Sequence, residues 1–273
     1  MSKLPNPRLP FNAECLQLRF YNFAENDRIA VLFSREYGLL RAIAKGARSS
    51  RSKMGPLLSP LRHSQIQLVA GKGLHKIRQV QGVQAWSALQ RDYDKLMCGL
   101  VMAELIALFC QEEDAQPDLF DGTIMALALL AETPRPKLQL LWYLLFFLGQ
   151  QGALADLDTC TRCDLELFPG DPVFFETRRA GLQCDACAPP AQDTEHLALS
   201  EAQHESLLTL RETPNPAKIQ LTEVELNALL RAFHTYVYHA SGQRIKSFSA
   251  LYADPESELA LLTQSPQGPS TAP

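Results

Sequence analysis

The chain has 273 residues, of which 46% are hydrophobic and 21% are charged. This length favours two domains, and the composition is typical of a folded globular protein. A wholly disordered chain, a collagen-like chain and a small disulfide-stapled scaffold are thereby excluded. The longest apolar run, Leu138 to Leu148, has about eleven residues, whereas a membrane span needs roughly twenty. Because the N-terminus also has no apolar core of signal-peptide length, we expect a cytoplasmic protein with no membrane partner.

The formal net charge of −4 hides a strong asymmetry along the chain. Residues 1–91 contain fifteen Lys and Arg against four Asp and Glu, whereas residues 92–273 contain eleven against twenty-six. The first part therefore carries a net charge of +11 and the second part −15. Between positions 29 and 91, Glu36 is the only acidic residue. We infer that the first part binds a polyanion and that the second part contacts a different kind of partner.

Five short β-strands are predicted in the first ninety residues from alternating or β-branched runs. In the first of them, Leu16, Leu18 and Phe20 are expected to share one face. Gly71-Lys72-Gly73 is interpreted as a hairpin turn, with a phosphate loop as the weaker alternative. Five antiparallel strands over about seventy residues favour an OB-fold barrel, and a small SH3-like barrel is the alternative. The predicted strands are Glu14 to Phe20, Arg28 to Ser34, Leu39 to Lys45, Ser64 to Ala70 and Leu74 to Val83.

Helical periodicity replaces the strand pattern after Trp86. Helices are predicted over 92–113, 118–132 and 137–150, and two more should begin at the capping boxes that follow Ser200 and Thr222. The predicted fold class is α+β: a five-stranded OB-fold barrel in residues 1–87, then an all-helical domain in residues 88–253. A four-cysteine zinc-binding insert is expected within that domain at 156–190. The Pro-, Ser- and Gln-rich residues 254–273 are expected to be disordered.

Four of the seven cysteines form a metal-ligand pattern. Cys160 and Cys163 make one C-x2-C pair, and Cys184 and Cys187 make a second pair twenty residues later. This spacing is typical of a tetrahedral zinc site, and the segment between the pairs is expected to form a small hairpin. Four thiolates leave no open coordination position, so we expect one structural Zn²⁺ per chain; two disulfides, redox sensing or catalysis are the alternatives. The three other cysteines are expected to be small buried residues.

The cations of the barrel are the candidate ligands for nucleic acid, because neutralising phosphates releases counterions. Three of them lie in a Gly- and Ser-rich break, Gly46 to Pro60, that no strand pattern includes. Among the aromatic residues, Phe20 and Phe33 are expected in the core, whereas Tyr21 and Tyr37 are better placed to stack on bases. The predicted nucleic-acid-binding residues are Arg28, Arg35, Tyr37, Arg41, Lys45, Arg48, Arg51, Lys53, Lys72, Lys76 and Arg78.

Two stretches resemble a known family. Asn22 to Leu61, NFAENDRIAVLFSREYGLLRAIAKGARSSRSKMGPLLSPL, resembles the N-terminal domain of the bacterial DNA repair protein family RecO. Near the C-terminus, Tyr238 to Leu251, YHASGQRIKSFSAL, also resembles that family, as does the four-cysteine insert within a helical domain. The resemblance implies an OB-fold, a helical domain and a zinc module. It further implies binding of single- and double-stranded DNA with little sequence preference and annealing of complementary strands. Recombinase loading with RecR, contact with single-stranded DNA-binding protein and association with the nucleoid are also implied.

We therefore expect a DNA recombination mediator that is not an enzyme, since no nucleotide-binding, metalloprotease or hydrolase motif is present. A zinc-containing regulator that recognises one DNA sequence or RNA is the main alternative; a nuclease is disfavoured because the barrel has few carboxylates. Arg244 and Lys246 are predicted to bind a partner, namely the acidic tail of single-stranded DNA-binding protein. In the alternative interpretation, these two residues only stabilise a helix C-terminus.

Overall fold

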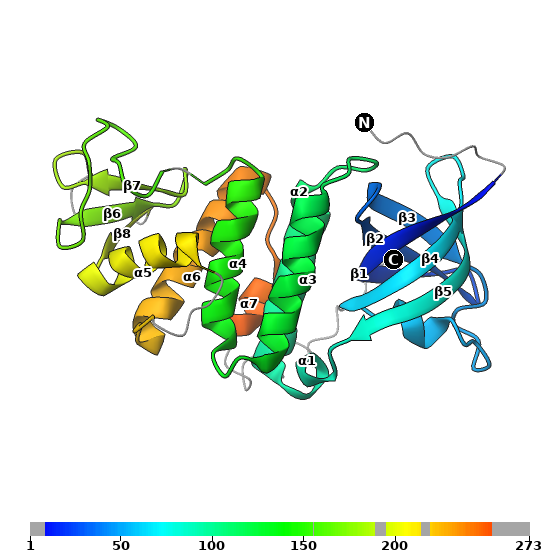
Figure 1. Ribbon diagram of the computed structural model, residues 1–273. Coiled ribbons are helices and arrows are strands. Elements are labelled where there is room, and N and C mark those ends of the chain that lie inside the picture. Colours follow the sequence, from blue (N-terminus) through cyan, green and yellow to red (C-terminus); the bar gives the residue numbers. More distant parts are fainter. Residues whose placement is uncertain (1–8, 155, 189–194, 214–218, 253–273) are drawn as a thin grey trace, which may run out of the picture.

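The computed structural model describes residues 9–154, 156–188, 195–213 and 219–252. A β-barrel lies at one end of the molecule, upright helices lie in the middle, and a small three-stranded sheet lies at the other end (Figure 1). The expected disorder of residues 254–273 falls outside the described residues. Within the described ranges, no helix is long and apolar enough to cross a membrane.

The N-terminal barrel has five strands in the closed order β1-β2-β3-β5-β4. All neighbouring strands are antiparallel except β3 and β5, which pair in parallel through Ala42 with His75 and Ile43 with Lys76. This crossover order, together with the helical region and the cysteine cluster, confirms the predicted α+β class with an N-terminal OB-fold. The strands are β1 (Pro10–Phe23), β2 (Asp27–Ser34), β3 (Gly38–Ala44), β4 (Arg62–Val69) and β5 (His75–Ala85).

A β-bulge in β1 changes which side chains share a face. The pairing of β1 with β2 shifts between Gln17 and Arg19, so Arg19 lies opposite Val31 and Phe20 lies opposite Ala30. Val31 is on the outer face of the barrel, whereas Ala30 belongs to the barrel core. The expectation that Phe20 shares a face with Leu16 and Leu18 is therefore wrong, because a bulge adds one residue and reverses the alternation.

The outer face of the barrel packs on the helices through a continuous apolar core. Leu16, Leu18, Val31 and Phe33 belong to the same buried cluster as the helices. The Phe33 and Phe120 ring centroids are 5.8 Å apart across this contact. Because both sides of the contact are apolar and buried, the barrel and the helices form one packed unit.

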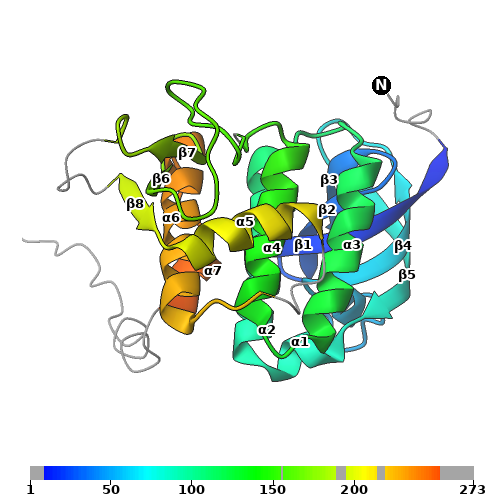
Figure 2. The same cartoon turned by 60° about the vertical axis from the view of Figure 1, so that its left-hand side comes forward.

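Seven helices follow the barrel in the described part of the chain. The helices α2, α3 and α4 stand between the barrel and the small sheet, and α5 packs against α4 on the side of the small sheet (Figures 1 and 2). Both predicted capping boxes are present, at Ser200 before α5 and at Thr222 before α6. The bounds are α1 (Ser87–Arg91), α2 (Tyr93–Phe109), α3 (Pro117–Glu132), α4 (Pro136–Gln150), α5 (Glu201–Glu212), α6 (Glu223–Ser241) and α7 (Lys246–Tyr252).

Gly38 occupies the closest approach between the barrel and the loop that joins α2 to α3. Its φ is +69°, and a Cβ atom built on it would lie 2.0 Å from the carbonyl oxygen of Asp114. Next to it, the Leu39 backbone N–H donates to Gln111 O at 3.3 Å and the Glu113 backbone N–H donates to Leu39 O at 3.2 Å. A side chain at position 38 is therefore incompatible with this junction.

Candidate nucleic-acid interface and metal centre

Four cysteine side chains converge beside the small sheet, which comprises β6 (Val173–Glu176), β7 (Gly181–Cys184) and β8 (His196–Leu199). The first two strands are the predicted hairpin. The sulfur atoms of Cys160, Cys163, Cys184 and Cys187 all lie within 4.8 Å of one another, and Cys163 Sγ is 3.8 Å from Cys184 Sγ. Sulfurs about 2.3 Å from one tetrahedral zinc ion are separated by about 3.8 Å. The cluster can therefore bind a metal ion, and its dimensions fit zinc.

The thiol groups of this cluster differ in acidity. Burial opposes ionisation of Cys160, but hydrogen bonds from the backbone N–H groups of Cys184, Arg162 and Cys163 lower the pKa of its thiol to about 6. Hydrogen bonds with Cys163 and Cys184 raise the pKa of Cys187 to about 12. A cation bound between the sulfurs would favour their thiolate forms.

The three remaining cysteines are buried in the barrel and the helices, as expected. Burial raises the pKa of Cys15, Cys98 and Cys110, the last to about 12. These thiols are therefore protonated at neutral pH and act as small apolar side chains.

The basic break between β3 and β4 forms turns and one short 3-10 helix, Gly55–Leu58. The side chains of Arg48, Arg51 and Lys53 are exposed there. The Arg48 backbone N–H donates to Asn26 O at 2.9 Å, and its Nη1 donates to Ala24 O at 3.3 Å. These bonds hold the loop against the turn between β1 and β2, while Arg51 and Lys53 extend beyond it.

A second exposed set of cations follows β5 and the turn before it. Lys72 lies in the predicted hairpin turn, and Lys76 and Arg78 alternate with the buried residues His75 and Ile77. Because successive side chains of a strand point to opposite faces, Lys76 and Arg78 lie on the outer surface of the barrel. Both are therefore accessible to a ligand on the side away from the barrel core.

Four predicted DNA ligands have partners within the chain. The Arg35 guanidinium makes two hydrogen bonds of 2.8 Å to Asp121 of α3, and Arg41 Nε lies 2.7 Å from Glu112 Oε1. The Arg28 guanidinium lies 4.2 Å from the centroid of the Phe20 ring. The half-buried Tyr37 packs edge-on against Phe11, with ring centroids 5.1 Å apart.

A groove of about 580 Å³ lies where the barrel, α2 and the start of α7 meet. Its cationic lining residues are Arg19, Arg41, Arg244 and Lys246, and apolar residues of α2 such as Leu100, Ala103 and Leu108 also line it. The Lys246 backbone N–H donates to Glu104 Oε2 at 2.9 Å, and the Arg244 guanidinium lies 5.7 Å from the Tyr238 ring centroid. The two predicted partner-binding residues therefore lie in a groove that combines cations with apolar surface.

Sequence reasoning did not select Arg19, which is exposed on β1 with its guanidinium 5.3 Å from the Tyr21 ring centroid. Its outward position depends on the bulge. The alternation of Leu16, Leu18 and Phe20 predicted that Arg19 lies on the opposite, inner face of the strand. The observed pairing with β2 shows that Arg19 lies on the outer face.

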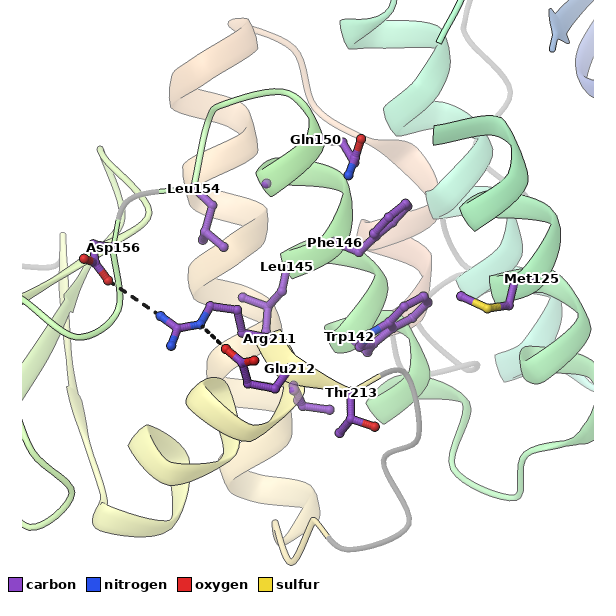
Figure 3. Close-up of a pocket in the computed structure, with 12 residues that line it drawn as sticks. Met125, Trp142, Leu145, Phe146, Gln150, Leu154, Asp156, Arg211, Glu212 and Thr213 are labelled. Atoms are coloured by element: carbon purple, nitrogen blue, oxygen red, sulfur yellow. Dashed lines mark hydrogen bonds and ion pairs between the residues drawn. The ribbon is translucent and has the colours of Figure 1, made fainter. Parts of the chain in front are cut away.

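A second cavity, of about 510 Å³, lies among α3, α4 and α5 (Figure 3). The rings of Trp142 and Phe146 stack there, with centroids 5.5 Å apart. The Arg211 guanidinium at its edge lies 3.6 Å from Asp156 and 2.7 Å from Asp158, so it links α5 to the cysteine-bearing segment. These ion pairs give Arg211 a structural role.

A basic OB barrel joined to a helical domain with a four-cysteine site defines a class of nucleic-acid-handling proteins. The family model described as "Recombination protein O N terminal" matches residues 9–86, and that described as "Recombination protein O C terminal" matches residues 90–248. The chain therefore belongs to the recombination protein O (RecO) family, which acts in DNA repair and recombination. This confirms the resemblance seen in the sequence.

Proposed function

We propose that this protein is a recombination mediator that binds single- and double-stranded DNA with little sequence preference and anneals complementary strands. Its action would be non-catalytic, and loading of recombinase with RecR would follow binding. One observation carries the proposal: two barrel cations beside the helices are paired with acidic side chains, while the cations on the loop and on β5 are exposed and form no ion pair among the described residues. Arg35 and Arg41 belong to the first group. The loop and β5 therefore offer a polyanion cations that no acidic side chain of the described residues neutralises.

The exposed cations act by screening repulsion between two phosphate backbones. Each phosphate contact releases counterions, so the binding needs no base recognition. Two strands held at low mutual repulsion can then pair through their own bases. Arg28, Arg35, Arg41 and Tyr37 contribute less to this surface, because each is engaged within the chain. The main ligands would be Lys45, Arg48, Arg51, Lys53, Lys72, Lys76 and Arg78.

The groove at Arg244 and Lys246 would receive the acidic tail of single-stranded DNA-binding protein. Cations would bind the carboxylates, and the apolar surface of α2 would receive the hydrophobic end of the tail. Arg41 of the barrel lines the same groove, so the bound acidic tail would contact the barrel there. This contact would bring the mediator to DNA strands that are coated with single-stranded DNA-binding protein.

The zinc site would be structural, with one Zn²⁺ per chain in a module at 156–190. The barrel at 1–87 and the helical domain at 88–253 would divide DNA binding from partner binding. In the cell, the protein would be cytoplasmic and associated with the nucleoid through its DNA.

The test is the triple variant Arg48→Ala, Arg51→Ala, Lys53→Ala in the full chain. We expect weaker binding to every DNA sequence, a log–log salt slope shallower by about one unit per lost contact, and a parallel loss of annealing. Arg179→Ala, which removes an exposed cation near the small sheet, is the control and should leave binding unchanged. Wild-type binding restricted to one DNA sequence or to RNA would instead support a regulator. Normal binding by the triple variant would refute the assigned surface.

A further inference from the structure

The outer face of β1, β2 and β3 changes character along its length. At one end, Leu16, Val31, Phe33 and Leu39 are buried against the helical domain. Toward the other end, Arg19 and Tyr21 of the same face line the groove beside α2, and Ile29 and Ile43 are only half-buried. An apolar sheet face that continues beyond its covering layer is a candidate binding surface.

This more exposed end, which we call the aromatic face, is defined by the strand register. Tyr21 pairs with Ile29, Ile29 pairs with Ile43, and Ile43 pairs with Lys76, so these four residues form one row across four strands. Phe23 lies two residues beyond Tyr21 and therefore on the same side of β1. Tyr21 is 48% exposed and Phe23 is 46% exposed. Two aromatic rings thus lie adjacent on an open, half-apolar surface.

Cations surround this aromatic face. The Arg19 guanidinium lies over the Tyr21 ring, and Arg48 reaches the carbonyl oxygen of Ala24, directly after Phe23. Lys76 ends the central row, and exposed Lys45 directly follows Ala44, which pairs with Arg28 at the end of the β2–β3 ladder. The Asp27 carboxylate accepts a hydrogen bond of 2.8 Å from the Gly46 backbone N–H, so this acid holds the basic loop in position.

We propose that the aromatic face stacks unpaired bases and thereby makes the protein prefer single strands over duplex; this rests on the proposed DNA binding. Every base has a π-face that is exposed in a single strand and covered by its neighbours in a duplex. The aromatic rings can stack about two bases while the surrounding cations contact the flanking phosphates. A strand fits this surface better than a protein segment does, because the half-exposed rings are surrounded by cations.

The test compares the double variant Tyr21→Ala, Phe23→Ala with the wild-type full chain. Fluorescence anisotropy measures binding to a labelled oligothymidylate and to a duplex of equal length at several salt concentrations. We expect affinity for the single strand to fall about tenfold or more and affinity for the duplex to change less than twofold. The salt slope should stay the same, because no phosphate contact is removed. Phe168→Ala, at an exposed aromatic residue of the cysteine-bearing segment, should change neither affinity.

Two further variants make the result specific to stacking. The exchange Tyr21→Phe, Phe23→Tyr keeps both rings and should retain single-strand affinity. In Phe23→Trp, oligothymidylate should quench the new indole fluorescence, whereas the two native tryptophans are buried and serve as an internal reference.

The outcomes separate the two proposals. If the wild-type protein binds neither probe, both the proposed function and the role of the aromatic face are refuted. If the wild-type protein binds both probes and the double alanine variant binds the single strand equally well, only the aromatic face is refuted, and another partner covers it. An equal loss for duplex and single strand would also refute stacking as the source of the preference.

Discussion

Substitution of Gly38 by Ala should loosen the junction between the barrel and the helical domain. The new methyl group would meet the backbone of Asp114, with 2.0 Å to its carbonyl oxygen, and a backbone atom cannot move aside as a flexible side chain can. The positive φ of +69° adds strain of its own. Either the strand or the loop between α2 and α3 must shift.

The cost follows from what this shift breaks. A left-handed conformation costs a non-glycine residue about 1 to 2 kcal/mol. The two backbone hydrogen bonds of Leu39, to Gln111 and from Glu113, contribute about 1 kcal/mol each. The free energy of unfolding should therefore fall by about 3 to 4 kcal/mol.

Two other glycines provide matched controls. Gly46 and Gly73 have φ of +66° and +71°, and a Cβ atom on either would have no neighbour within 4 Å. Alanine at either position should cost only the backbone strain, about 1 to 2 kcal/mol. Urea unfolding, followed by circular dichroism on each full-length variant, measures the difference. Equal destabilisation by Gly38→Ala and Gly46→Ala would refute the close approach at Asp114.

Three further results are expected. Wild-type protein purified under reducing conditions should contain about one zinc per chain, and Cys163→Ser should release it without unfolding the barrel, as measured by elemental analysis and circular dichroism. A hydrogen bond from Arg35 lowers the pKa of Asp121, so this pair stabilises the fold above the ordinary carboxyl pKa and loses its effect as the pH falls through the lowered value. The stability difference between wild type and Asp121→Asn should therefore shrink in urea titrations from pH 7 to pH 3. Arg244→Glu with Lys246→Glu should weaken binding of an acidic tail peptide while DNA affinity is nearly unchanged. Unchanged peptide binding would show that the peptide binds at another site.

Local sequence patterns predicted those parts of the structure that local forces determine. The capping boxes at Ser200 and Thr222 work within four residues of chain, and the two C-x2-C pairs form tight turns whose spacing suits one ion. The five strands were recognisable because alternation reports burial on one face. Each of these signals depends on neighbours in the sequence.

The parts that were not predictable depend on contacts between distant residues. The bulge at Gln17 to Arg19 is visible only in the pairing with β2, and it exposes Arg19 and Tyr21 on one face. The ion pair of Arg35 with Asp121 joins residues 86 positions apart, so the charge count could not separate Arg35 from free cations such as Arg51. Composition predicted a basic barrel, but only packing distinguishes the cations that remain accessible.

The acidic half of the chain therefore does more than balance the charge of the basic half. Asp121 and Glu112 neutralise cations on the helix-facing side of the barrel, while the apolar cluster around Phe33 closes that side to solvent. A barrel separated from its helices would expose this apolar area and leave Arg35 and Arg41 without their acidic partners. It would then bind DNA on a side that the intact protein does not offer. On the proposed function, the helices would direct a DNA strand to the loop, β5 and the aromatic face, so point substitutions in the full chain are the appropriate way to assign the surface.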